Sequence, residues 1–146
     1  MSEFLPELLV RSLALPAARP LVARLPGAPT PYLVGGAVRD LMLGGAPVDL
    51  DLAVEGDAAA FAASLGGEVR VHDRFGTSTV KLDGFTYDIA RTRREAYSHP
   101  GALPDVEPAP LAEDLTRRDF TVNAIALALA GATAGELSSA PGALDD

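Results

Sequence analysis

Short stretches in which polar and apolar residues alternate dominate the middle of the chain. Alternation with a period of two predicts half-buried β-strands, and short apolar runs that end at glycine predict more deeply buried ones. These stretches lie at residues 32–34, 48–54, 69–71, 77–82 and 85–90. Asp83-Gly84 separates the last two and predicts a hairpin turn between them. We therefore predict a mixed sheet of about five strands.

Helical spacing of apolar residues appears between and after these strands. The expected helices lie at residues 2–26 (two short ones), 37–43, 57–65 and 119–130. Asp57 is expected to cap its helix. Four prolines predict an irregular loop over about residues 97–113, and the tail after the last helix shows no further packed element. The predicted fold class is α+β, with helices flanking the sheet.

The composition limits the classes of function open to this chain. Its 146 residues, 48% of them hydrophobic, suffice for one domain with a core. The formal net charge of −8 argues against a large basic surface, so any RNA would be held mainly elsewhere. The absence of cysteine excludes disulfides and thiolate chemistry and fits a reducing cytoplasm. Because no apolar run is long enough to span a membrane and the acidic N-terminus is unlike a signal peptide, we expect a cytoplasmic protein without a membrane segment.

Two aspartates in the predicted strand at residues 48–54 are the first candidates for chemistry. The two-residue period of a strand places Asp49 and Asp51 on one face. Two like charges this close repel each other, and a cation between them relieves the repulsion. Hard oxygen ligands at this spacing suit Mg²⁺. The alternative is a half-exposed strand whose aspartates are simply solvated.

The stretch before this strand adds a candidate phosphate site. Gly35-Gly36 lies between a predicted strand and a predicted helix, and Arg39 follows one turn later. A glycine turn lets phosphate approach the backbone, the helix start offers unpaired N–H groups, and arginine can add bidentate contacts. The sequence matches neither a P-loop nor G-x-G-x-x-G. The alternative is a tight turn that needs glycine for its geometry alone.

Asp88 is the candidate for a third metal-binding carboxylate. In the predicted strand at residues 85–90 it lies opposite the apolar face, beside small residues. A third carboxylate is needed to hold the second ion of a two-metal site. The alternative is a solvated aspartate.

The last candidates lie at the start of the helix expected at residues 119–130. Asp119 and Asn123 would share one helix face, and Arg118 precedes them. Asn123, embedded among apolar residues, needs hydrogen-bond partners that a ribose or a neighbouring backbone can supply. Asp119 is equally explained as a helix cap and Arg118 as a solvated charge. His72 and His99 lack the companion ligands of a zinc site and are interpreted as ordinary polar residues.

Three segments together resemble one known family. They are VGGAVRDLMLGGAPVDLDLAVEGD, HDRFGTSTVKLDG and YDIARTRREAYSHPGALPDVEPAPLAEDLTRRDFTVNAIAL, which span about residues 31–130. In order and spacing they are similar to the class II CCA-adding enzymes and bacterial poly(A) polymerases. Gly35-Gly36 followed by D-x-D fits the wider polymerase-β-like nucleotidyltransferases, and GGAVRD with RRDFTVNA narrows the resemblance.

The resemblance implies a polymerase-β-like nucleotidyltransferase fold and a two-metal reaction, in which the tRNA 3′-hydroxyl attacks the α-phosphorus of CTP or ATP. Two Mg²⁺ ions would bind to Asp49, Asp51 and Asp88. The implied nucleotide-binding residues are Gly35, Gly36, Arg39 and Asp40 around the triphosphate, and Arg118, Asp119 and Asn123 at the ribose. The segment at residues 97–113 resembles the flexible loop of the family, which is thought to help change specificity between C and A.

The resemblance also implies a division of the chain. We expect an N-terminal helical segment at residues 1–30, a head domain at 31–135, and the start of a linker to a neck domain at 136–146. The E-D-x-x-R motif that pairs with the base in this family does not occur before Asp146. Domains beyond the head hold the tRNA in this family, so we expect low activity from this chain alone. The alternatives are a stand-alone small nucleotidyltransferase with another substrate, and a non-catalytic remnant that binds nucleotide.

Overall fold

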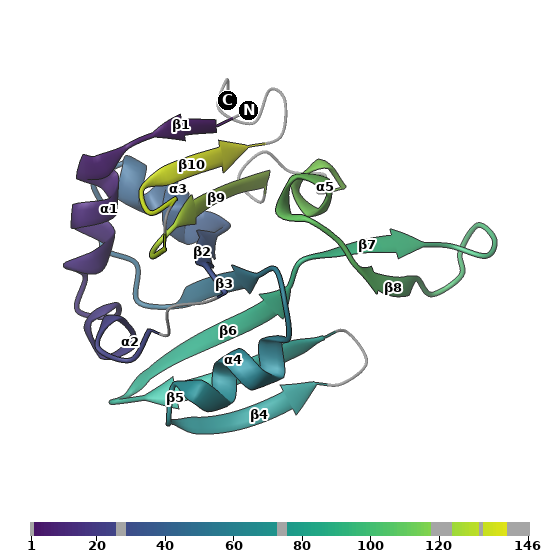
Figure 1. Cartoon of the computed structure of the whole chain (residues 1–146), viewed down its shortest axis with the longest axis horizontal. Helices are drawn as coiled ribbons and strands as arrows, with labels where there is room; N and C mark the ends of the chain where they lie inside the picture. The colour runs from purple at the N-terminus through teal and green to yellow at the C-terminus, as the bar shows by residue number, and fades with distance from the viewer. Residues whose placement is uncertain (1, 26–28, 73–75, 118–123, 132, 140–146) are drawn as a thin grey trace.

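The computed structural model describes residues 2–25, 29–72, 76–117, 124–131 and 133–139, and these form a mixed eight-stranded sheet with helices around it (Figure 1). Only β3 and β6 run parallel among the neighbouring strands described, and the other pairs are antiparallel. From one edge to the other, the strands are β1 (Ser2–Phe4), β10 (Glu136–Ser139), β9 (Ile125–Ala128), β2 (Pro31–Val34), β3 (Leu50–Val54), β6 (Phe85–Arg91), β5 (Thr77–Leu82) and β4 (Glu68–His72). This architecture confirms the α+β class and the mixed sheet, which has more strands than expected.

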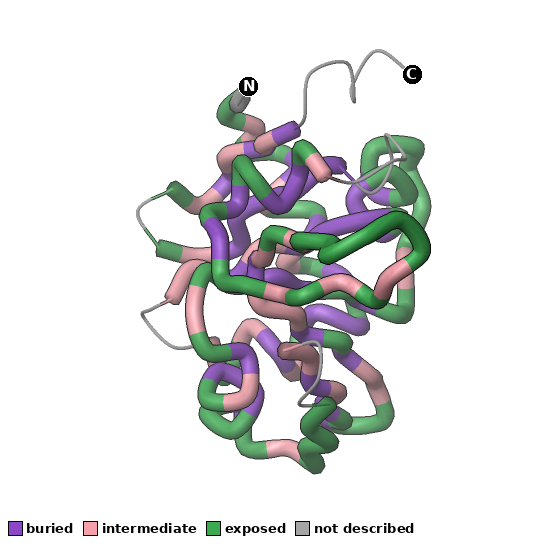
Figure 2. The backbone as a smooth tube through the Cα atoms, turned by 90° about the vertical axis from the view of Figure 1, so that its right-hand side faces the viewer, coloured by how far each residue is buried: buried purple, intermediate pink, exposed green. Residues whose placement is uncertain are grey.

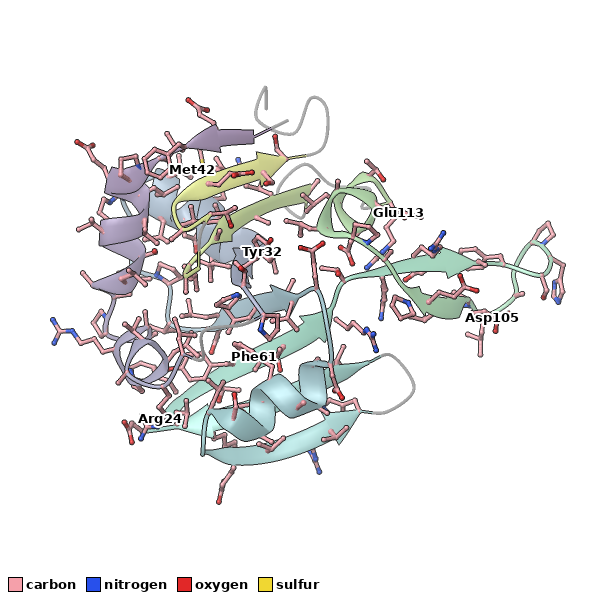
Figure 3. The ribbon with its side chains drawn as sticks, viewed as in Figure 1. Arg24, Tyr32, Met42, Phe61, Asp105 and Glu113 are labelled. Carbon is pink, nitrogen blue, oxygen red and sulfur yellow. The ribbon has the colours of Figure 1, made fainter. Side chains whose placement is uncertain are left out.

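One face of the sheet carries the main core. Leu33, Leu52 and Ile89 lie on this face in register across three neighbouring strands, and all three are buried. The helices that contribute to this core or flank it are α1 (Pro6–Leu13), α2 (Arg19–Val22), α3 (Gly36–Met42) and α4 (Ala58–Ser64). From α4, Phe61 reaches the sheet (Figure 3). As predicted, Asp57 caps α4, because its Oδ1 accepts a hydrogen bond from Ala60 N at 3.1 Å.

In the described structure, α5 (Leu111–Thr116) covers part of the opposite face. There it packs Leu111 and Leu115 on Val34, Ala53 and Ala126. On the neighbouring strands β6 and β5 the same face bears the exposed Asp88 and the half-buried Thr79. Among the described residues, this face is therefore covered unevenly, and the side that carries Asp88 is open.

A two-stranded hairpin projects from the body of the molecule (Figure 1). It consists of β7 (Arg93–Ala96) and β8 (Asp105–Pro108), and it is exposed or half-buried from end to end (Figure 2). The loop expected at residues 97–113 is irregular over residues 97–104, but the expectation is wrong beyond them, because β8 and the start of α5 are regular. Pro108 is tolerated since β8 pairs with β7 alone in the described structure, and an edge strand has N–H positions that need no partner.

Two other expectations are wrong. The helix expected at 119–130 is not continuous, because Ile125–Ala128 form β9. The tail does contain a packed element, since Glu136–Ser139 form β10, which lies between β1 and β9. The short strand β1 was not predicted.

Candidate active site

The glycine turn joins β2 to α3 as the sequence predicts. Gly35 has φ 73° and ψ −148°, a combination that residues with a side chain rarely adopt. A Cβ built on Gly36 meets no atom within 4 Å, so the first residue of α3 borders open space. Arg39 and Asp40 lie on the exposed side of this helix. The Asp40 carbonyl accepts a hydrogen bond from Gly45 N at 2.7 Å and so closes the turn after α3.

The carboxylates lie beside this turn. Because β2 and β3 are antiparallel and Val34 pairs with Asp51, the end of β2 adjoins the start of β3. Asp51 in turn pairs with Asp88 across the parallel strands β3 and β6, and both side chains are exposed. Neighbouring strands are about 4.8 Å apart, so these two carboxylates are direct neighbours on one face. Asp49 immediately precedes β3 and is exposed as well.

Asp88 has a partner that sequence analysis missed. Its Oδ1 accepts a hydrogen bond from Thr79 Oγ1 at 2.8 Å, and that hydroxyl lies 3.2 Å from His72 Nε2. A sequence signal for Thr79 did exist, because a two-residue turn at Asp83-Gly84 fixes the register of the hairpin and pairs Thr79 with Asp88. His72 had been interpreted as an ordinary polar residue.

The predicted ribose residues Arg118, Asp119 and Asn123 lie outside the described residues. The described elements on either side are α5, which is followed by Arg117, and β9, which is preceded by Ala124. Since Ala126 of β9 pairs with Val34 of the antiparallel β2, the start of β9 lies at the same end of the sheet as the glycine turn. The chain thus returns to this end of the sheet directly after the segment 118–123.

Two carboxylates fix the position of α5 on the sheet, at the ends of β3 and β6 that lie away from the glycine turn. Glu55 Oε2 accepts a hydrogen bond from Leu111 N at 3.0 Å, and its Oε1 accepts one from Tyr32 Oη at 3.1 Å. Burial, followed by the charge of Glu55 and the hydrogen bond to it, raises the pKa of Tyr32 to about 12. The second carboxylate, Asp114, is 2% exposed and accepts hydrogen bonds from Arg93 N at 2.7 Å and Arg117 Nη2 at 3.3 Å.

The donor set beside the glycine turn suits a hard divalent cation. Among the residues that the structure describes, no group of three or more His, Cys, Asp or Glu side chains is arranged to hold a metal ion. The in-register carboxylates of Asp51 and Asp88 still fit Mg²⁺, which takes one or two carboxylates and completes its shell with water and substrate phosphates.

Within the described helices, none is long and apolar enough to cross a membrane.

Comparisons of sequence and of structure with known proteins agree on one family. The family described as "Poly A polymerase head domain" matches residues 31–140. The A-adding tRNA nucleotidyltransferase of Halalkalibacterium halodurans is 45% identical over 111 residues, which are 73% of this chain and 26% of that protein. A solved CCA-adding enzyme in its apo form II superposes with a TM-score of 0.84 at 38% identity, over 100% of this chain and 37% of the other. A CCA-adding enzyme solved in complex with CTP superposes with a TM-score of 0.76 at 33% identity, over 99% of this chain and 35% of the other. This chain therefore spans about a third or less of the length of these relatives.

Proposed function

Because this chain belongs to the poly(A) polymerase head domain family, we propose that it is the catalytic head of a tRNA nucleotidyltransferase, which adds C or A from CTP or ATP to the tRNA 3′ end. The observation that carries the proposal is the in-register pair Asp51 and Asp88 on the open face, beside the Gly35 turn. Carboxylates and a glycine turn at one end of a sheet are what a nucleoside triphosphate and its metal require. The relatives that act on tRNA or bind CTP supply the substrates of the proposal.

Each predicted site residue has a role in this proposal. Gly35 and Gly36 let the triphosphate approach the backbone, and Arg39 binds it through its guanidinium. Asp40 supports this turn. Asp49, Asp51 and Asp88 would hold two Mg²⁺ ions, which when bound would polarise the phosphate and neutralise the negative charge that develops on pyrophosphate. Residues 118, 119 and 123 position the ribose.

The reaction depends mostly on position and charge. The tRNA 3′-hydroxyl attacks the α-phosphorus, the bond to the β-phosphate oxygen breaks, and pyrophosphate leaves. In this proposal Asp88, whose side chain is exposed, would assist by accepting the proton of that hydroxyl. Orientation of the reactants and electrostatic stabilisation by the fixed carboxylates supply the rest.

The division of the chain also stays a proposal. Residues 1–30 are attached to the head, because Leu8, Leu15 and Leu21 are buried in the main core and the Tyr87 hydroxyl donates a hydrogen bond to the Ala17 carbonyl. We place the start of the linker, expected within 136–146, after β10. Residues 97–113, which include β8 and the start of α5, correspond to the proposed specificity loop. We propose a cytoplasmic enzyme that holds its tRNA mainly through domains beyond the head.

Calorimetric titration with ATP and CTP, with and without Mg²⁺, tests the proposal. Asp51→Asn should abolish Mg²⁺-dependent binding, because it removes one of the two paired charges. Asp83→Asn is the matched control: it removes the same charge at an exposed turn, and asparagine tolerates the positive φ of 49°. If ATP and CTP bind equally well without Mg²⁺ and to Asp51→Asn, the catalytic assignment is refuted and a nucleotide-binding remnant is favoured.

A further inference from the structure

A chain of hydrogen bonds approaches the carboxylate pair from the side of β5. Asp51, Asp88 and Thr79 are in register across β3, β6 and β5, so their side chains share the open face. Thr79 Oγ1 donates to Asp88 Oδ1 at 2.8 Å, and His72 Nε2 lies 3.2 Å from the same hydroxyl. Asp88 thus has a like charge on one side and a hydroxyl donor on the other.

The direction of each hydrogen bond follows from the number of protons. A threonine hydroxyl has one proton, and a carboxylate can only accept. The single hydroxyl proton of Thr79 is donated to Asp88, so only the lone pairs of Thr79 Oγ1 face His72. His72 Nε2 must therefore carry a proton and donate it to Thr79 Oγ1. The arrangement therefore requires the Nε2-protonated tautomer of His72, in the order His72 to Thr79 to Asp88.

We propose that Thr79, oriented by His72, is a positioning residue that fixes the Asp88 carboxylate so that its Oδ2 is left for the cation shared with Asp51. An exposed aspartate next to a like charge would otherwise turn away from it. The hydroxyl holds Oδ1 toward β5 and so selects one orientation of the carboxylate. This inference rests on the proposed function, because it assigns a role to residues that touch one of its metal ligands.

The expected loss of metal affinity can be taken from other metal sites in which a hydrogen-bond partner of a ligand is removed. Loss of such a partner typically weakens metal affinity by about 10- to 100-fold, and Asp88 is exposed, so we expect the lower end, about 10-fold. Thr79→Val removes the hydroxyl and keeps the shape, whereas Thr79→Ser keeps the hydroxyl. Thr77→Val is the matched control, because Thr77 is on the same face of the same strand and is also half-buried.

Titration of the chain with Mn²⁺ alone, followed by the electron paramagnetic resonance of the free ion, tests the proposal without catalysis. We expect Thr79→Val to bind Mn²⁺ about 10-fold more weakly than the wild type. Thr79→Ser and Thr77→Val should bind like the wild type, and all three variants should melt near its temperature. His72→Leu should weaken binding in the same direction and His72→Gln, which keeps a donor near the position of Nε2, should restore it.

The outcomes separate this inference from the proposed function. Loss of Mn²⁺ binding in Asp51→Asn together with wild-type binding in Thr79→Val would overturn the role of Thr79 and leave the metal site standing. If the wild type binds no better than Asp51→Asn, the metal site and the inference fail together. A second readout is the tautomer of the neutral His72 ring from its ¹⁵N chemical shifts. A ring protonated at Nδ1 would overturn the order of donors.

Discussion

Asp114 is expected to be the anchor that ties the projecting hairpin to α5. It is the only acidic side chain of α5 that is buried in the described structure, and it accepts hydrogen bonds from the first residue of β7 and from Arg117. Replacement by alanine leaves the N–H of Arg93 without this acceptor and removes a charge partner of Arg117. The hairpin and α5 would then lose a shared attachment point.

The size of this effect can be worked from the contacts. A hydrogen bond to a charged group contributes about 1.5–3 kcal/mol to stability. Arg117 is 26% exposed and keeps Glu95 at 3.5 Å, so the second contact is partly replaced. We therefore expect Asp114→Ala to lower the free energy of unfolding by about 2–4 kcal/mol. Glu113→Ala is the control, because its ion pair with Arg94 is exposed and its loss should cost less than about 1 kcal/mol.

Urea denaturation compares the two variants, and amide hydrogen exchange locates the effect. The Arg93 amide should exchange faster in Asp114→Ala, whereas the Thr92 amide, which donates to Val54 O at 2.9 Å within the main body, should change much less. Equal free energies of unfolding for Asp114→Ala and Glu113→Ala would refute the anchor. Unchanged exchange at Arg93 would refute its location.

Two further predictions concern the glycine turn and the hairpin. Because of the backbone angles of Gly35, the variant Gly35→Ala should lower the free energy of unfolding, measured by urea denaturation, by about 1–3 kcal/mol. Gly36→Ala has open space around the new methyl group and should fold normally. It should weaken ATP binding if the phosphates approach the backbone at Gly36. The hydrogen bond from Tyr97, reinforced by the charges of Arg117 and Arg93, lowers the pKa of Glu95 from 4.5, so its stabilisation is complete above that pH and is lost as pH falls through the lower folded-state value. Carboxyl ¹³C titration should show this pKa rising in Tyr97→Phe, and an unchanged titration would contradict the assigned cause.

The sequence predicted the elements whose pattern is local. Alternation located β3 and β6, and the Asp83-Gly84 turn located the hairpin of β5 and β6. The glycine turn into α3 was predicted from glycines between an apolar run and a helical pattern. These features held because each depends on neighbouring residues only.

The errors came from elements whose identity depends on distant partners. Ile125–Ala128 are apolar throughout and lie between β10 and β2, so both faces of β9 are buried and no alternation marks it. A short, alanine-containing apolar run fits a buried helix equally well by periodicity. β10 contains only one large apolar residue, Leu137. It is a strand because its backbone pairs with β1 on one side and with β9 on the other.

The uneven cover of the sheet also explains why the carboxylates can occupy one face together. Burial of two like charges without a cation would cost far more than the fold could recover. Asp51 and Asp88 are exposed to solvent on this face, and α5 packs on Val34 and Ala53, the residues next to Asp51. The Thr79 hydroxyl donates a hydrogen bond to Asp88, the other member of the pair. In the proposed site, removing the charge of Asp51 and removing the hydroxyl of Thr79 are therefore different perturbations: the first would take away a metal ligand, and the second would free the orientation of the Asp88 carboxylate.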